Sequence, residues 1–115
     1  MGHLTGQLPT TMRRISEAED IVRGIRYRVK DAALLALDGH YDLVSGLCDR
    51  PPGCATFLFR GVRGHYFTLR LTDWQDETDS IDPCSIGDAM TIYRELKEKV
   101  LTWEDAFPEV KVQDA

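Results

Sequence analysis

Residues 55–72, with the sequence ATFLFRGVRGHYFTLRLT, decide the fold of this 115-residue chain. Two runs rich in aromatic and aliphatic residues flank a glycine-bounded turn at residues 61–64, which is the pattern of a β-hairpin. Successive side chains of a strand point to opposite faces, so we expect one face of this hairpin to be apolar. The apolar face would carry Phe57, Phe59, Phe67, Leu69 and Leu71. The other face would carry Arg60, Tyr66, Thr68 and Arg70. We expect the hairpin to form the centre of an antiparallel sheet.

Two further strands are expected upstream of the hairpin. In residues 25–30 apolar and cationic side chains alternate, which predicts a strand with one apolar face. Residues 32–37, with the sequence AALLAL, are compatible with helix or strand, and the Asp38-Gly39 turn that follows favours a strand.

Helices are predicted from capping patterns, in which a side-chain oxygen accepts a hydrogen bond from the first helical turn. A short helix is expected to begin at Ser16 and to end before Gly24. The principal helix is expected over about 85–101, with an apolar stripe at steps of three and four, and a last turn at 102–107. The predicted fold is therefore α+β: an antiparallel sheet of about four strands with the principal helix packed on it.

Composition and length predict a single small domain. With 43% hydrophobic and 29% charged residues, the chain can bury one core and is too apolar to be disordered. The domain is expected over residues 12–108, between a flexible arm at 1–11 and a polar tail at 109–115. No run approaches the roughly 18 apolar residues of a membrane span, and the start lacks the basic and apolar regions of a signal peptide. We expect a soluble, cytoplasmic protein that does not bind membranes.

The net charge of −5 is distributed unevenly along the chain. Residues 1–30 carry six Arg and Lys against three Asp and Glu, whereas residues 73–115 carry four against twelve. The acidic segment at 73–82 predicts a surface that binds a basic protein partner, with a tryptophan as the aromatic anchor. The residues expected to bind this partner are Asp73, Trp74, Asp76, Glu77, Asp79 and Asp82.

The cations nearer the start of the chain predict an alternative site, a basic strand face that binds nucleic acid. Arginine and lysine would contact phosphates, and a tyrosine would stack on a base. The residues expected to form this face are Arg26, Arg28, Lys30, Arg60, Tyr66 and Arg70. The sequence has no glycine-rich phosphate loop, helix-turn-helix or RNA-binding signature, so direct binding of nucleic acid is the second hypothesis.

Three cysteines, Cys48, Cys54 and Cys84, are too few and of the wrong parity for a disulfide framework. The five residues between Cys48 and Cys54 do not suit a zinc site, so we expect no metal and no cofactor. Cys84 lies just before the principal helix, where the helix dipole would lower the pKa of its thiol. An enzyme that uses this thiol as nucleophile is therefore the third hypothesis.

The hairpin and its surroundings resemble a loosely related set of small proteins carried by phages, plasmids and other mobile elements. This resemblance covers roughly residues 24–108, and it implies a sheet-plus-helix architecture and a mobile-element origin without transferring any catalytic residue. It rests on Thr56-Phe-Leu-Phe-Arg60, Gly64-His-Tyr-Phe-Thr68, Trp74-Gln75, residues 89–93 and Trp103-Glu-Asp-Ala-Phe107. Together with the acidic segment, it predicts a non-enzymatic protein that inhibits a nucleic-acid-handling or defence complex of a host or virus. An exposed strand edge could also join two copies into a homodimer.

Overall fold

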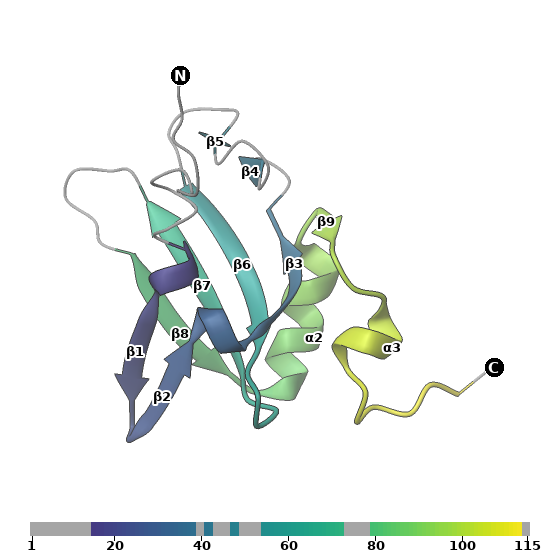
Figure 1. The fold of residues 1–115 in the computed structure, drawn as a ribbon. Coiled ribbons are helices and arrows are strands. Elements are labelled where there is room, and N and C mark those ends of the chain that lie inside the picture. The colour runs from purple at the N-terminus through teal and green to yellow at the C-terminus, as the bar shows by residue number, and fades with distance from the viewer. Residues whose placement is uncertain (1–14, 39–40, 43–46, 49–53, 73–78, 114–115) are drawn as a thin grey trace.

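The computed structural model describes residues 15–38, 41–42, 47–48, 54–72 and 79–113 (Figure 1). Its centre is a five-stranded antiparallel sheet in the order β8-β7-β6-β3-β9. The predicted α+β fold is confirmed, with five strands in the main sheet where about four were expected. These strands are Ala33–Leu37 (β3), Cys54–Arg60 (β6), Tyr66–Thr72 (β7), Ser80–Cys84 (β8) and Glu98–Lys99 (β9).

The predicted hairpin is confirmed as strands β6 and β7, and β6 is the middle strand of the five. The register places Phe57 opposite Leu69, both on the apolar face that the alternation predicts. Gly64 in the connecting turn has a φ of 83°, a left-handed conformation that glycine adopts without strain. Local sequence therefore determines both the pairing of these strands and the turn that joins them.

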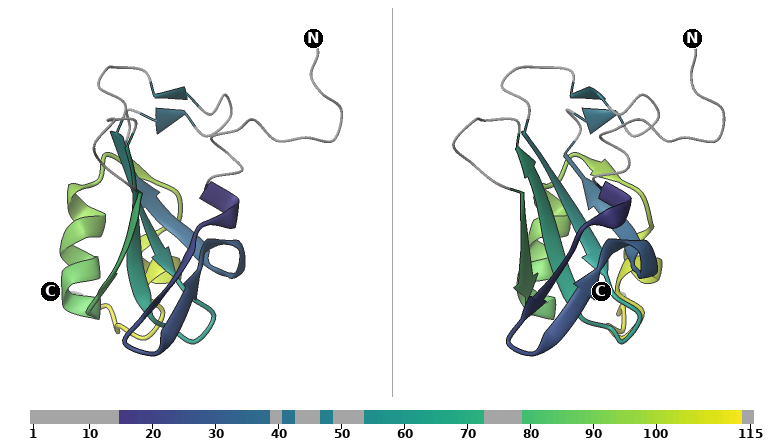
Figure 2. Two further views of the ribbon diagram at one scale, coloured as in Figure 1. Left: turned by 90° about the vertical axis from the view of Figure 1, so that its left-hand side faces the viewer. Right: turned by 60° about the vertical axis from the view of Figure 1, so that its left-hand side comes forward.

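Both faces of the main sheet are covered, so the molecule has three layers (Figure 2). The face that carries the phenylalanines of β6 lies under a two-stranded sheet, Glu19–Val22 (β1) and Ile25–Arg28 (β2), which contributes Tyr27 to the core. The opposite face lies under the helices Ile86–Glu95 (α2) and Trp103–Ala106 (α3). The expected packing of the principal helix on the sheet is confirmed. The layer that β1 and β2 form on the other face was not predicted.

The remaining elements are short. The 3-10 turn Val29–Asp31 (η1) contains Lys30, which was expected on the strand before it, because the chain reverses there to enter β3. Tyr41–Asp42 (β4) and Leu47–Cys48 (β5) form a separate antiparallel pair. The strand expected at residues 32–37 is confirmed as β3. Among the described residues, no helix has the length and apolar character needed to span a membrane.

The short helix predicted to begin at Ser16 is wrong beyond its first turn. Residues 15–17 are helical, but the chain then enters β1 and pairs with β2. Arg23 and Gly24 have positive φ values of 53° and 81°, which give the two-residue turn of a hairpin. Strand pairing and burial against the main sheet outweigh the local capping pattern.

The principal helix ends at Glu95, earlier than expected. Its start is as predicted, since the Ser85 hydroxyl accepts a hydrogen bond from the backbone N–H of Asp88 (3.1 Å). After the helix, β9 pairs with β3, and the backbone N–H of Val100 donates to the carbonyl of Leu35 (2.9 Å). The segment after the helix therefore makes sheet hydrogen bonds in place of helical ones.

Candidate functional site

The acidic segment predicted to bind a partner is described only at its end. Asp79 and Asp82 are exposed, just before and within β8. Asp79 also lines a hollow of about 290 Å³ with Glu17, Glu19 and Asp20, which lie at the start of β1 and before it. This acidic hollow joins carboxylates that are far apart in the sequence, so no local pattern could predict it. The other predicted residues lie outside the described part of the chain: Asp73, Trp74, Asp76 and Glu77.

The structure does not bring the predicted nucleic-acid-binding residues to one face. Arg26 and Arg28 lie on β2, which covers one side of the main sheet. Arg60 and Tyr66 contact the helical segment on the other side. Arg70 is exposed and alternates with Tyr66 along β7, so it projects from that same side of the sheet. The expected single cationic face is therefore wrong, because the alternation within one hairpin does not say which element covers each face.

Arg60 and Tyr66 hold the end of α3 against the sheet. The Nη1 atom of Arg60 donates to the carbonyl oxygens of Asp105 and Ala106, each at 2.7 Å. The Tyr66 side chain is buried, and its hydroxyl donates to the Glu109 carboxylate (2.7 Å). Burial and then this carboxylate raise the pKa of Tyr66, while the hydrogen bond lowers the pKa of Glu109. With 3% of its surface exposed, Tyr66 cannot stack on a base, which corrects that expectation.

Two of the predicted cations, Arg26 and Arg28, line a groove of about 410 Å³ between the tips of two hairpins, together with Arg63. In Figure 1, the β1–β2 turn and the β6–β7 turn point to the same end of the molecule. This cationic groove is lined by Arg26, Arg28 and Arg63, and the buried residues Tyr27 and Phe67 lie at its base. Its other lining residues are Gly24, Ile25, Asp31, Gly61, Val62 and His65.

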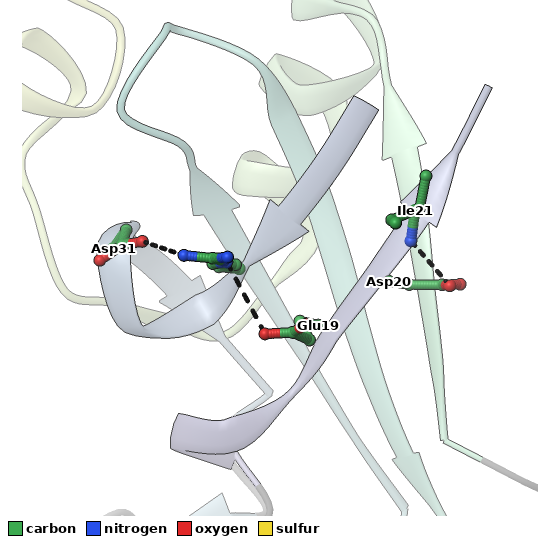
Figure 3. A network of polar contacts seen from close by, with 5 residues as sticks. Glu19, Asp20, Ile21 and Asp31 are labelled. Atoms are coloured by element: carbon green, nitrogen blue, oxygen red, sulfur yellow. Dashed lines mark hydrogen bonds and ion pairs between the residues drawn. The ribbon is translucent and has the colours of Figure 1, made fainter. Parts of the chain in front are cut away.

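Arg28 forms ion pairs with two carboxylates that Figure 3 labels: Asp31, which lines this groove, and Glu19, which lines the acidic hollow. Its Nε is 3.7 Å from Glu19 Oε1, and its Nη1 is 3.8 Å from Asp31 Oδ2. Both distances exceed those of N–H···O hydrogen bonds, so the contacts are ion pairs only. The Nε atom is buried and has no hydrogen-bond partner. Beside Glu19, the Asp20 carboxylate accepts a hydrogen bond from the backbone N–H of Ile21 (2.8 Å).

The cationic groove also presents apolar surface and the exposed ring of His65. Val62 and Ile25 on its walls are 78% and 38% exposed. Tyr27 packs edge-on against Phe67, with ring centres 5.4 Å apart, and against the exposed His65 at 6.3 Å. Positive charge beside apolar and aromatic surface suits a ligand that has an anionic group and a flat apolar part.

Metal and thiol chemistry have little support in the described part of the chain. No three His, Cys, Asp or Glu residues gather there to hold a metal ion. Burial, and then the charge of Asp88, raise the pKa of the half-buried Cys84 thiol to about 11. The expectation that the helix dipole lowers this pKa is wrong, because desolvation of the thiolate has the larger effect. At neutral pH, Cys84 is a protonated thiol and a weak nucleophile.

We expect iodoacetamide to alkylate Cys84 slowly at pH 8, in a variant whose Cys48 and Cys54 are replaced by serine. A pKa near 11 in place of 9.0 lowers the thiolate fraction roughly a hundredfold. The more basic thiolate is also more nucleophilic, so the net rate should be about tenfold below that of the same variant in urea. A rate that levels off below pH 9 would instead indicate a lowered pKa and would support the thiol-enzyme hypothesis.

Arg63 and His65 are groove residues that the sequence-based prediction missed. They belong to the β6–β7 turn, whereas Arg26 and Arg28 belong to a hairpin far earlier in the chain. Only the packing of β1 and β2 onto the main sheet brings the two turns together. One feature of the sequence could have indicated the groove. Val62, beside Arg63, is an apolar residue in a turn, a position that polar residues usually occupy.

Comparisons of the chain with protein-family models, with curated proteins and with solved structures found no match. The resemblance to small proteins of mobile elements stays a prediction from the residues that carry it.

Proposed function

We propose that this protein is a small binding module that holds a phosphate-bearing ligand, single-stranded nucleic acid, in its cationic groove. The observation that supports this proposal most is the convergence of Arg26, Arg28 and Arg63 from two hairpins on one cavity. Guanidinium groups bind phosphate oxygens through paired, charge-assisted hydrogen bonds. Two of these arginines, Arg26 and Arg28, belong to the nucleic-acid-binding set expected from the sequence.

The groove favours binding over catalysis. Among the described residues that line it, Asp31 is the one carboxylate, and it is paired with Arg28. A nucleophile or a general acid needs a second group within hydrogen-bond reach to activate it. The remaining polar side chains of the lining are the three arginines, His65 and the buried Tyr27. Such a lining supplies charge and contact surface to a ligand.

Volume and lining favour a single strand over a duplex. About 410 Å³ lies in the range of small-ligand sites, roughly 300–1,000 Å³. A duplex presents its phosphates on the outside and its bases in the stack, so it would leave Val62 and Ile25 uncovered. An unpaired base can cover apolar side chains while its phosphate contacts an arginine.

The test replaces Arg26 and Arg63 together with alanine and measures binding of a labelled twelve-nucleotide oligothymidylate by fluorescence anisotropy. We expect a roughly hundredfold loss of affinity at low salt, because two charge-assisted contacts of about 1.5 kcal/mol each are removed. The slope of log affinity against log salt should become shallower by about 1.4, since each phosphate contact on a single strand contributes about 0.7.

The matched control replaces Arg70 and Lys111 with alanine. Both are exposed cations outside the groove, so this variant loses the same net charge as the Arg26 and Arg63 variant. It should leave the affinity within about twofold of the original chain, as expected for screened charges at a distance. Equal losses in the two double variants would contradict the proposal, because overall charge alone would then explain the binding.

The acidic hollow favours a second function, binding of a basic protein. Asp79, Glu17 and Glu19 line it together with Leu69 and Ile81, which are buried. A lysine or arginine of a partner could place its charge near these carboxylates. We propose as this partner a nucleic-acid-handling or defence complex that the protein inhibits, on the basis of the acidic charge together with the mobile-element origin that the resemblance implies. Absence of oligonucleotide binding would favour this second function.

A further inference from the structure

The guanidinium of Arg28 is neutralised by two carboxylates but hydrogen-bonded to neither. One edge of a guanidinium, made by Nε and one terminal nitrogen, matches two oxygens of an oxyanion. In Arg28 the Nε on this edge is buried and has no acceptor, with Glu19 3.7 Å away. A buried donor without an acceptor is unfavourable, so this edge gains from a ligand that supplies one.

Glu19 is a weak occupant of the position beside Arg28. The strand register places Glu19 directly opposite Arg28, on the neighbouring strand (Figure 3). The Glu19 side chain is 54% exposed, so water competes for its carboxylate and the ion pair contributes little. A phosphate that reached hydrogen-bond distance of both nitrogens on the Arg28 edge would bind more strongly than Glu19 does.

The rest of the same groove offers surface for a flat apolar group. Val62 and Ile25 expose carbon to solvent, and His65 is held edge-on to Tyr27 with its own ring exposed. Nucleobases combine a flat π-surface with little charge, and they stack on such rings without a sequence requirement. A phosphate joined to a base is therefore the ligand chemistry that fits both parts of the groove.

We infer that the cationic groove binds one nucleoside phosphate, with the phosphate at the Arg28 guanidinium, which it draws away from the ion pair with Glu19, and with the base against Val62 and His65. The inference rests on the proposed function and names the unit that the groove recognises. That unit is either a free nucleotide or one nucleotide of a single strand, because the two share this chemistry. Glu19 is the internal competitor of the phosphate, so its removal strengthens binding.

The experiment records ¹⁵N–¹H spectra of the full chain, including the Nε–H signals of arginine, during titration with four probes. The probes are thymidine 5′-monophosphate, thymidine, inorganic phosphate and a twelve-nucleotide oligothymidylate. The Arg28→Lys variant identifies the Arg28 signal by its loss. The monophosphate should shift the Arg28 Nε–H signal and the backbone signals of Val62 and His65. Inorganic phosphate should shift the Arg28 signal alone, and thymidine should shift none of them.

Two charge-matched variants test the competitor. Glu19→Gln should bind the monophosphate about two- to fivefold more tightly, the range expected when an exposed ion pair no longer competes. Glu17→Gln removes the same charge from the same acidic hollow. Its effect on the affinity for the monophosphate should be less than half the effect of Glu19→Gln. In an Arg28→Gln background, the effect of Glu19→Gln should disappear.

The outcomes separate the inference from the proposed function. Binding of the oligonucleotide without a shift at Arg28, or equal effects of Glu19→Gln and Glu17→Gln, would overturn the inference and leave the groove as a nucleic-acid site. Binding of the oligonucleotide but not of the monophosphate, with the Arg28 shift kept, would assign the groove to a strand and remove the free nucleotide. No binding of any probe by any variant would overturn both.

Discussion

Replacing Phe57 with alanine is expected to lower the free energy of unfolding by about 3–5 kcal/mol, a large share of the stability of a domain this size. Phe57 lies on β6, the middle strand, and none of its surface is exposed. Its ring stacks with Phe59, with centres 6.4 Å apart, in the core under β1 and β2. Urea unfolding followed by circular dichroism measures the change.

The control for Phe57→Ala is Val112→Ala, which removes methyl groups from a side chain that is 56% exposed. Its effect should stay within about 0.5 kcal/mol, as is usual for surface positions. A Phe57→Ala variant as stable as this control would mean that the core under β1 and β2 does not form as described.

Replacing Phe107 with alanine is expected to cost about 3–5 kcal/mol on the other side of the sheet. Phe107 is fully buried, and its ring centre lies 4.8 Å from Trp103, 5.5 Å from Tyr93 and 5.4 Å from Tyr66. Its loss should also admit water to Trp103. In a Trp74→Phe background, where Trp103 is the only tryptophan, the native emission should move to longer wavelength.

Tyr66→Phe separates the two ways in which the end of the chain is attached. It keeps the ring beside Phe107 and removes the hydroxyl that donates to Glu109. The expected loss is about 1 kcal/mol, the usual net value of one hydrogen bond, and the emission of Trp103 should not move. If Phe107→Ala were no more harmful than Tyr66→Phe, ring packing would not be what holds α3 to the sheet.

The central hairpin could be predicted from residues 55–72 because each of its determinants is local. The run of β-favouring residues that places Phe57 and Phe59 two apart on one face, and a glycine at the left-handed position of the turn, act within a few residues. The β1–β2 hairpin was missed for the opposite reason. The Ser16 pattern favours a helix, and the strand forms because its partner and the main sheet offer more hydrogen bonds and burial.

The candidate site could be predicted only in part. Arg26 and Arg28 could be identified because every second residue of a strand lies on the same face. This period predicts a shared face for Arg26, Arg28 and Lys30. Arg60 and Tyr66 follow the same alternation within their own hairpin, and yet helices cover them. Alternation shows which residues share a face and carries no information on what is packed against that face. The groove depends on such packing between distant turns.

The outer strands of the main sheet and the β1–β2 pair protect the molecule from the addition of further strands. In the described part of the chain, β8 carries Pro83, whose nitrogen has no hydrogen to donate, and β9 is only two residues long. On β1, the N–H of Ile21 is already bonded to the Asp20 carboxylate. Open strand edges are where folded proteins join one another and aggregate. These edges therefore offer few free backbone N–H groups to a further strand.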